Sequence, residues 1–409
     1  MTNILFQNST VFDGHNADIK ADQFVWVSGS KICYVGNNNP GGKFDQIIDL
    51  KGKIIMPGLI DAHFHAYAST VDFPALETLP KSYIAHHAAR LLAGALDRGF
   101  TTVRDVGGAD YGLWRASEEG LIKSPRIFYC GRAFSQTGGH ADVRPIHMEP
   151  CSCSNLNGNL GVVVDGVDNL RKAVRESLRQ GAHHIKVMVS GGIASPSDPI
   201  WMMQYSMEEL EAAVDEASRK RAYVAAHAYT AETIERAVMA GIRTIEHGNL
   251  INTRVAEIVA KQEAYVVPTL ITYDAFARFG KEAKTPQHLL DKLDDVRLKG
   301  QEAVEICAKA NVKLGFGTDL LGEMHSLQLE EFRLRGEVQS PFEVLKSAAS
   351  INAEIVGRTG ELGCIQKNAY ADILIIDGNP LEDLSLLYAN KSKINAIMKN
   401  GKWVRRLSN

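Results

Sequence analysis

The sequence has little of several features that would assign a class of protein at once. Six cysteines in 409 residues argue against a disulfide framework, and we interpret the closest pair, Cys151 and Cys153, as part of a loop. No apolar run approaches the roughly 18–20 residues of a membrane span, and the first residues lack the basic and apolar regions of a signal peptide. A net charge of −3 gives no sign of nucleic-acid or membrane binding. We therefore expect a cytoplasmic protein that binds neither nucleic acid nor membrane.

The chain has an ordinary globular composition at a length above that of one core. Hydrophobic residues make up 45% and charged residues 23% of the sequence, which are the proportions of a globular protein. At 409 residues the chain exceeds the usual size of a single hydrophobic core. We therefore expect either one large barrel with an accessory domain or two domains.

Both ends of the chain show a β-type pattern. Residues 4–57 contain short apolar runs separated by Gly, Asn and Asp, and this pattern is typical of strands and turns. The pattern returns at residues 371–404, where Asn400-Gly401 predicts a tight hairpin. Because only the two ends share this character, we predict one small β-sandwich domain formed from residues 1–57 and 363–409.

Residues 58–362 alternate between predicted strands and predicted helices. The predicted strands cover residues 59–63, 101–106, 126–130, 184–189, 223–227, 244–247, 265–268 and 313–318, and the clearest helices cover 83–98, 167–180, 207–221, 231–240 and 255–261. Eight βα units favour a TIM (β/α)8 barrel. No GxGxxG follows the first strand, so an open doubly wound sheet is less favoured. The segment 134–165 is too long for a plain βα loop, and we expect it to cover the functional site.

Two histidines mark the end of the first predicted barrel strand. His63 and His65 are separated by one residue, and in an extended strand their side chains point the same way. Such a pair on its own is more often a pair of core histidines than half of a metal site. Because chemistry in a TIM barrel lies at the C-terminal ends of the strands, the other strand ends decide between the two interpretations.

The later strands add further ionisable residues at the same level. His227, His247 and Asp319 lie at strand ends, and Lys186 lies within an apolar strand. Taken singly, His227 is equally a core residue and Asp319 equally a helix N-cap. Lys186 is harder to explain structurally, because a lysine in an apolar strand must pair, lose its proton or be modified. The coincidence of all these residues at one rim favours a functional site.

The set of side chains indicates a metal centre. Four imidazoles and a carboxylate suit zinc or a similar metal. They are too many for one tetrahedral ion, which predicts two divalent ions a few ångströms apart. Two ions need a bridging group, and a neutral lysine that adds carbon dioxide becomes a carbamate that can bridge them as a carboxylate does. Lys186 is the candidate for this modification.

These residues resemble the binuclear subtype of the amidohydrolase superfamily, which has His-x-His, a carboxylated lysine, two histidines and an aspartate. The resemblance covers the whole chain and implies a distorted (β/α)8 barrel with a β-sandwich split between the chain ends. It also implies the metal ligands, which are His63, His65, Lys186, His227, His247 and Asp319.

Within the superfamily the chain resembles the branch of Xaa-Pro dipeptidases (prolidases) and related metal-dependent carboxypeptidases. The resemblance is carried by residues 56–63, 101–105, 137–140, 186–192 and 227–229. It implies that His140 and Tyr229 polarise the substrate. The structural alternatives are a solvated loop histidine for His140 and a packing residue at the barrel mouth for Tyr229.

The resemblance implies metal-dependent hydrolysis of an amide (peptide) bond in an Xaa-Pro dipeptide or an N-acyl amino acid. A metal-bridging hydroxide would attack the carbonyl carbon, and Tyr229 or His140 would stabilise the oxyanion. Asp319 would carry the proton of the attacking water to the leaving nitrogen. We further expect a homo-oligomer that acts on a small molecule.

Two other classes of function remain open at this point. One is a hydrolase of cyclic amides, lactones, carbamates or phosphotriesters, related to imidazolonepropionase-like enzymes. The other is a non-catalytic scaffold of the same fold, which the complete ligand set disfavours. A dipeptidase differs from the first alternative in needing a cation for a free carboxylate, and Arg104, Arg132 and Arg144 are candidates for that cation.

Overall fold

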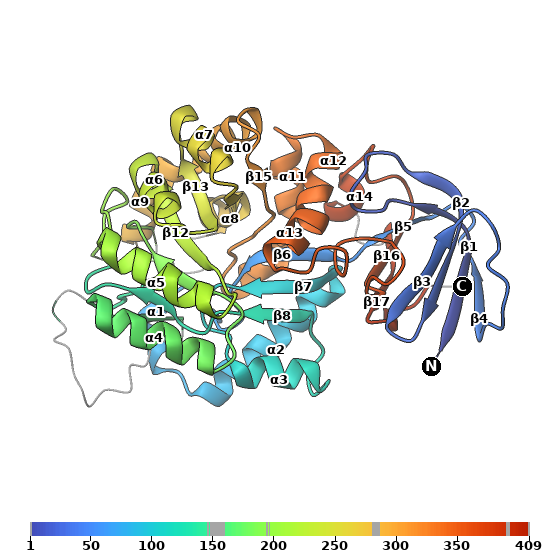
Figure 1. Cartoon of the computed structure of the whole chain (residues 1–409), viewed down its shortest axis with the longest axis horizontal. Coiled ribbons are helices and arrows are strands. Elements are labelled where there is room, and N and C mark those ends of the chain that lie inside the picture. Colours follow the sequence, from blue (N-terminus) through green and yellow to red (C-terminus); the bar gives the residue numbers. More distant parts are fainter. Residues whose placement is uncertain are drawn as a thin grey trace.

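The strands of the chain form three hydrogen-bonded sheets that lie in two regions of the molecule (Figure 1). The computed structural model describes residues 2–144, 147, 160–193, 195, 197–279, 287–389 and 393–407. Cys151 and Cys153 lie outside the described residues. Within the described part of the chain, no helix is long and apolar enough to cross a membrane.

One sheet joins the two ends of the chain. Its strands are β1 (Asn3–Val11), β2 (Lys20–Ser28), β3 (Lys31–Gly36), β4 (Gln46–Asp49), β5 (Ile54–Pro57), β16 (Ile373–Ile376), β17 (Ile394–Lys399) and β18 (Lys402–Arg405). They lie in the order β18-β17-β16-β5-β1-β2-β3, and β4 pairs with β1. The antiparallel pair β5–β16, in which Ile55 faces Ile375, is the seam between N-terminal and C-terminal strands. Figure 1 shows these blue and red strands together at the right, with both termini.

This sheet curls over a core of its own. Phe6 on β1 and Trp403 on β18 are separated by three strands in the sheet order, yet their rings meet edge to face with centroids 6.0 Å apart. Ile4, Val25 and Met398 fill the enclosed space. Apolar side chains on one face of each strand therefore close the domain. The predicted fold class is confirmed, and the boundaries at residues 57 and 363 stay a prediction.

The remaining two sheets form the barrel. Its eight strands are β6 (Leu59–Phe64), β7 (Phe100–Asp105), β8 (Arg126–Tyr129), β11 (Ile185–Met188), β12 (Val224–Thr230), β13 (Thr244–Leu250), β14 (Tyr265–Val267) and β15 (Lys313–Leu314). Hydrogen bonds link β6-β7-β8 in one sheet and β11 to β15 in the other, and β9 (Ala133–Ser135) and β10 (Gly161–Val163) extend the second sheet. All these strands run parallel to their neighbours.

Two irregular joints close the barrel. On one side the His183 N–H donates to the carbonyl oxygen of Tyr129 at 2.8 Å. On the other side the Ala62 N–H donates to Phe316 O at 2.8 Å, and the Asp319 N–H donates to His63 O at 2.9 Å. The last strand, predicted over residues 313–318, is regular only as far as Leu314, but the chain after it still pairs with β6. The barrel is therefore distorted at the place where Asp319 meets the first strand.

Helices cover the outside of the barrel (Figure 1). They are α1 (Phe73–Thr78), α2 (Lys81–Asp97), α3 (Tyr111–Glu118), α4 (Val167–Arg179), α5 (Met207–Arg219), α6 (Ala231–Met239), α7 (Thr253–Lys261), α8 (Leu270–Phe279), α9 (Gln287–Arg297), α10 (Gly300–Lys309), α11 (Glu330–Gly336), α12 (Pro341–Lys346), α13 (Asn352–Ile355) and α14 (Ser385–Tyr388), with a 3₁₀ turn at Gly322–Leu327 and a π turn at Ser347–Ile351.

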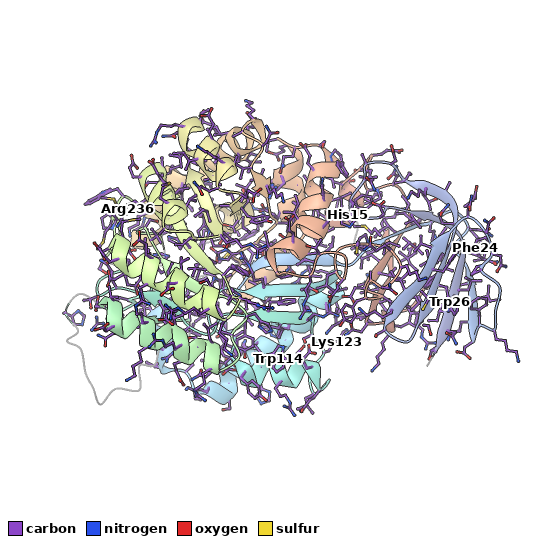
Figure 2. All side chains as sticks on the ribbon, viewed as in Figure 1. His15, Phe24, Trp26, Trp114, Lys123 and Arg236 are labelled. Carbon is purple, nitrogen blue, oxygen red and sulfur yellow. The ribbon has the colours of Figure 1, made fainter. Side chains whose placement is uncertain are left out.

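Local sequence explains where these helices begin and which face they bury. In α4 the apolar residues Leu170, Val174 and Leu178 recur at helical spacing, and all three are buried. The α5 helix begins at a capping box, in which Ser206 and Glu209 satisfy each other's backbone N–H groups. Figure 2 labels Trp114 of α3, which packs against a tyrosine of β8 at 6.4 Å between ring centroids. The helices thus hold the strand ends in place around the site.

Candidate metal centre and active site

The carboxyl ends of the barrel strands gather the predicted site residues around one pocket. His63 and His65 come from β6 and its end, Lys186 from β11, His227 and Tyr229 from β12, His247 from β13, His140 from the segment after β9, and Asp319 from the segment after β15. All eight side chains line the same pocket. The described parts of segment 134–165 supply His140, Ala141, Val143, Leu160 and Gly161 to its wall.

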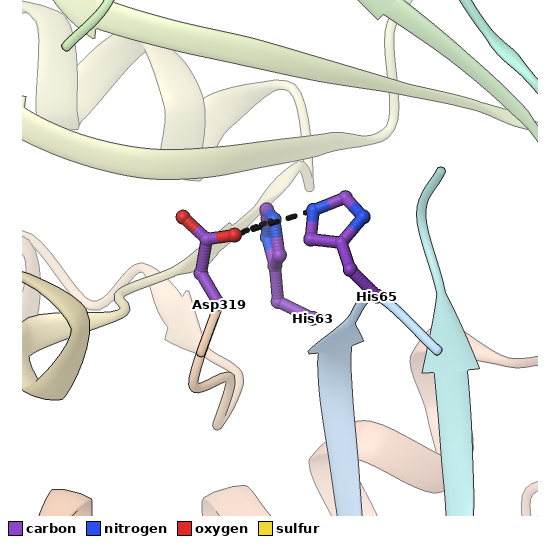
Figure 3. A group of neighbouring side chains, drawn as sticks. All are labelled: His63, His65 and Asp319. Carbon is purple, nitrogen blue, oxygen red and sulfur yellow. Dashed lines mark ion pairs between the residues drawn. The ribbon is translucent and has the colours of Figure 1, made fainter. Parts of the chain in front are cut away.

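Asp319 lies at the centre of the first group of side chains. Its Oδ1 atom is 3.4 Å from His63 Nε2 and 3.2 Å from His65 Nε2. Figure 3 shows the carboxylate facing the two imidazole rings. One ligand atom from each of the three residues lies within 4.8 Å of the others, which is the spacing that a single metal ion requires.

A second group of rings continues from the first. The His247 ring lies 4.7 Å from the His63 ring and 4.7 Å from the His227 ring between centroids. His247 Nδ1 lies 4.0 Å from the other Asp319 oxygen, Oδ2. Lys186 is 2% exposed and lines the same space. The four imidazoles and Asp319 therefore form one continuous row, which Lys186 adjoins.

The backbone is left-handed at two of these positions. His247 has a φ of 73° and Asp319 has a φ of 50°, and residues other than glycine rarely adopt such backbone angles. His247 lies within β13 and Asp319 follows the end of β15, and both side chains line the pocket. Unfavourable backbone conformations persist where the surrounding structure enforces them, and functional sites are common among such places.

Each of the four histidines has one ring nitrogen fixed by the protein. His63 Nδ1 contacts Glu246 Oε2 at 2.8 Å, and His65 Nδ1 contacts Gly107 O at 2.9 Å. His247 Nδ1 contacts Thr269 Oγ1 at 2.9 Å, and His227 Nε2 contacts Gly191 O at 3.2 Å. For His63 and His65 the second ring nitrogen, Nε2, faces the Asp319 carboxylate in the pocket. This is the outer-contact pattern of metal-binding histidines, so the residues present fit divalent metal ions.

Glu246 is a buried residue of the site that the sequence did not indicate. The Glu246 carboxylate contacts His63 Nδ1 through Oε2, and both of its oxygens accept hydrogen bonds from Arg104 Nη2 at 2.7 Å. Glu246 and Arg104 have fully buried side chains. Burial raises the pKa of Glu246, but the charge of Arg104 and the contact with His63 outweigh it and keep that pKa well below its usual range. The pairing with Arg104 therefore keeps Glu246 negatively charged, and this carboxylate holds the His63 ring in place.

Burial also sets the charge state of the pocket. It holds the pKa of His227 and of His247 well below the ordinary value, so these imidazoles are neutral and able to bind metal. Burial lowers the pKa of Lys186 as well, against the opposing charges of Glu246 and Asp319. For Asp319 burial raises the pKa, but the charge of His63 and the contacts with His63 and His65 keep it well below its usual range.

Tyr229 is placed to donate a hydrogen bond into the pocket. Its hydroxyl oxygen accepts from the Tyr273 hydroxyl at 3.0 Å, which leaves the proton of Tyr229 for another acceptor. Burial raises the pKa of Tyr229 well above its ordinary value, so the group stays a neutral donor. Its ring also lies 4.8 Å from the His227 ring, beside the row of imidazoles.

The three arginines named as candidates for a substrate carboxylate do not reach this pocket. Arg104 is buried against Glu246, and Arg144 pairs with Asp142 at 2.5 Å. Arg132 lines a separate cavity on the side of the barrel. Among the described residues, no arginine lines the pocket that contains the histidines. The sequence could not place Arg104 because its partner, Glu246, lies 142 positions away along the chain.

Part of the pocket wall is apolar. Phe73, Ile193, Phe276 and Leu321 line it and belong to one hydrophobic cluster of buried side chains. The polar side chains lie along the strand ends and the apolar ones along the loops and helices above them. A pocket with one polar side and one apolar side suits a small organic molecule that has one polar end.

The fold and the pocket define a (β/α)8-barrel enzyme, whose active site lies at the carboxyl ends of the strands. Comparison with known families is more specific. Residues 54–404 match the Amidohydrolase family, and the chain belongs to this family. It is therefore a hydrolase, in agreement with the resemblance inferred from the sequence.

Individual relatives are similar over nearly the whole chain. Ochratoxinase of Aspergillus niger is 31% identical over 371 residues, which cover 85% of this chain and 75% of the relative. The crystal structure of a prolidase complexed with N-methylphosphonate-L-proline superimposes with a TM-score of 0.96 at 45% identity, covering 99% of this chain and 100% of the other. A Xaa-Pro dipeptidase with bound methionine has a TM-score of 0.88 at 26% identity, with coverage of 99% and 100%. These similarities place the chain beside the prolidase-like members of the family.

Proposed function

We propose that this protein is a metal-dependent hydrolase that releases an amino acid from an Xaa-Pro dipeptide or an N-acyl amino acid. One observation carries the proposal: all eight side chains expected of a prolidase-like site line one pocket. The likeness to a prolidase that binds N-methylphosphonate-L-proline supports proline at the leaving side of the amide bond.

We assign six residues of the pocket to two divalent metal ions, for which zinc is the metal to be tested. They are His63, His65, His227, His247, Asp319 and a carboxylated Lys186. Divalent ions in such a site supply a hydroxide near neutral pH and polarise a carbonyl oxygen. The neutral imidazoles and the ionised carboxylate described above are the protonation states that metal binding requires.

Carboxylation of Lys186 follows from its surroundings. A lysine amine attacks carbon dioxide only as the neutral base, and burial favours the neutral form. The reaction forms one N–C bond, releases one proton and converts the amine to a carbamate anion. This anion presents two oxygens to the pocket where an unmodified lysine presents none.

Asp319 is the proton carrier in this proposal. Its carboxylate faces His63 and His65 at the centre of the row, where it reaches any water held between the strand ends. It accepts the proton of the attacking water and gives it to the leaving nitrogen. An amine cannot leave the tetrahedral intermediate without that proton, so one carboxylate serves both steps.

Tyr229 and His140 bind the scissile carbonyl oxygen in this proposal. The free proton of Tyr229 points to an acceptor other than Tyr273, and the developing oxyanion is such an acceptor. His140 lines the same pocket, with its ring stacked on His227. Fixed donors of this kind stabilise the charge that forms on the oxygen during attack.

The test is a substrate panel on zinc-loaded protein. Xaa-Pro dipeptides and N-acyl amino acids are compared with the corresponding proline amides, with lactones and with cyclic amides, and release of the free amino acid is measured. We expect hydrolysis of the dipeptides or N-acyl amino acids at rates well above those for lactones and cyclic amides. Turnover restricted to lactones or cyclic amides would contradict the proposal.

A further inference from the structure

His140 is held by a closed set of hydrogen bonds that the proposed function does not use. Its ring Nδ1 contacts Asp198 Oδ2 at 3.2 Å. Its backbone N–H donates to Gln204 Oε1 at 3.0 Å, and Gln204 Nε2 donates to the same Asp198 oxygen at 3.1 Å. Asp198 and Gln204 are both fully buried. The ring and the main chain of His140 are therefore tied to one carboxylate.

The His140 ring is also enclosed by two neighbours, the His227 ring and the backbone at Gly192. One face stacks on the His227 ring, with centroids 4.2 Å apart and an angle of 18° between the planes. The other contact surface is the backbone at Gly192, where an added Cβ would lie 2.2 Å from His140 Cε1. Gly192 therefore provides space that any other residue would fill, and the ring has one place in which to lie.

The segment that carries Asp198 is itself fixed from another element. The Gly192 N–H donates to Asp198 Oδ2 at 3.1 Å. Lys292 on α9 donates to three carbonyl oxygens of this segment, those of Gly192 at 3.0 Å, Ser195 at 3.0 Å and Asp198 at 2.7 Å. One ammonium group thus uses all of its donors to hold the segment at the level of the pocket.

The chemistry of a carboxylate determines what this arrangement does to His140. An ionised carboxylate only accepts hydrogen bonds, so the ring nitrogen that faces Asp198 carries a hydrogen. The pKa of Asp198 is lowered: burial raises it, but the charge and hydrogen bond of His140 outweigh burial. Because Nδ1 is occupied by Asp198, Nε2 is the ring nitrogen that remains for a substrate in the pocket.

We propose that Asp198 is a positioning residue that orients the His140 ring, with Lys292 holding the segment that carries Asp198 in place. The inference rests on the proposed function for its kinetic test, since His140 is there assigned to the substrate carbonyl. Among the described residues that line the pocket, Asp198 is absent, so in this proposal it acts through His140.

A double-mutant cycle on the zinc-loaded enzyme tests this coupling. Asp198→Asn keeps the shape of the side chain but removes the negative charge that faces His140 Nδ1, so the ring is held less firmly. We expect kcat/KM to fall by about 10–100-fold in the wild-type background. In a His140→Asn background the same substitution should cost less than about 2-fold, because the group it positions is absent. Equal losses in both backgrounds, or no loss in the first, would overturn the inference.

Lys292→Met provides a second variant that spares the core. Lys292 is only partly buried, so its loss loosens the Asp198 segment without disturbing the barrel. We expect a smaller fall in kcat/KM that again disappears in the His140→Asn background, and this cycle decides the question if Asp198→Asn does not fold. Zinc content and thermal unfolding of each variant show whether the metal-binding row is intact.

A crystal structure separates this inference from the proposed function. If the wild-type protein hydrolyses none of the amides, the proposed function fails, and the position of His140 still tests the inference. In zinc-loaded Asp198→Ala we expect the His140 ring to leave its stacked position on His227. A ring that stays stacked with unchanged orientation would show that Asp198 does not position it.

Discussion

At the scale of single residues, Asp319 differs from the other side chains of the row in what its loss should remove. The four histidines and the modified lysine hold charge and geometry, so a variant that lacks one of them should lose metal. In Asp319→Asn these five groups remain, and we expect much of the metal to stay. The proton carrier is lost, so kcat should fall by about 10²–10⁴-fold.

Metal analysis and kinetics on the same preparation decide this prediction. Asp110→Asn is the matched control, because Asp110 caps α3 and an asparagine caps a helix equally well. The control should keep its kcat. Near-wild-type kcat in metal-containing Asp319→Asn would remove Asp319 from the mechanism, and the proton carrier would then have to be sought at His140.

Lys186 gives the second prediction at this scale. Lys186→Ala should lose both metal and activity, because no carbamate can form. Short-chain carboxylic acids such as acetate should restore part of each, since the cavity left by the side chain can admit a carboxylate in place of the carbamate. The same acids should not raise the activity of the wild-type enzyme. A metal-loaded structure with an unmodified ammonium at Lys186, away from the metal, would refute the prediction.

Residues that lie at strand ends were predictable, and residues that depend on distant partners were not. His63 and His227 are indicated by their places near strand ends, and Lys186 by its place within an apolar strand. Glu246 was missed because its partner His63 lies 183 positions away, and only the pairing shows that it is buried with a charge. Arg104 is one of three candidate cations for the same reason, since its pairing with Glu246 shows only in the folded chain. Asp198, 58 positions from His140, left no signal in the sequence.

At the scale of elements, buried histidines outside the row, His183 and His325 among them, make the fold sensitive to acid. Burial lowers the pKa of His183, before β11, to about 4 and that of His325, in the 3₁₀ turn, to about 3. An unfolded histidine has a pKa of about 6.5, so below that pH the unfolded chain binds more protons than the folded one. The free energy of unfolding should therefore fall as the pH drops from about 6.5 toward 4.

Denaturant unfolding over this pH range, with a chelator present, measures the effect. In His183→Gln one of these buried groups no longer titrates, so the loss of stability with acid should be smaller than in the wild-type protein. The chelator prevents loss of metal from contributing to the difference. An identical slope of stability against pH in the two proteins would contradict the assignment to His183.

The positions of elements were predicted more accurately than their regularity. The first barrel strand was expected over residues 59–63 and is found as β6 over Leu59–Phe64, because its apolar run and the preceding Pro-Gly break are local signals. The last strand was expected to be regular as far as residue 318. It ends at Leu314, since the chain turns there to bring Asp319 to β6, and that turn depends on tertiary contacts.

At the scale of the whole molecule, the two chain ends should depend on each other for stability. The β5–β16 seam joins them, and Phe6 packs on Trp403 across the shared core. Removing residues 363–409 should therefore speed amide hydrogen exchange throughout the N-terminal strands. Full protection of residues 3–57 in the truncated protein would show that these strands fold without the C-terminal ones.

Fold class was the most predictable property at this scale. Alternating strand and helix patterns, with β-type patterns at both ends, allow few arrangements. The family match agrees with the arrangement that was inferred. Substrate choice was less predictable, because the apolar wall of the pocket is built from loops and helices whose side chains meet only in the folded chain.

The most direct test of the central claim is a zinc titration of the metal-free protein while hydrolysis of an Xaa-Pro dipeptide is followed. The claim is that the row of four imidazoles, Lys186 and Asp319 holds two metal ions that are needed to hydrolyse an amide. Activity should be absent without metal, rise with added zinc in the presence of bicarbonate, and level off near two equivalents per chain. Full activity in the metal-free protein, or a plateau at one equivalent, would contradict the account.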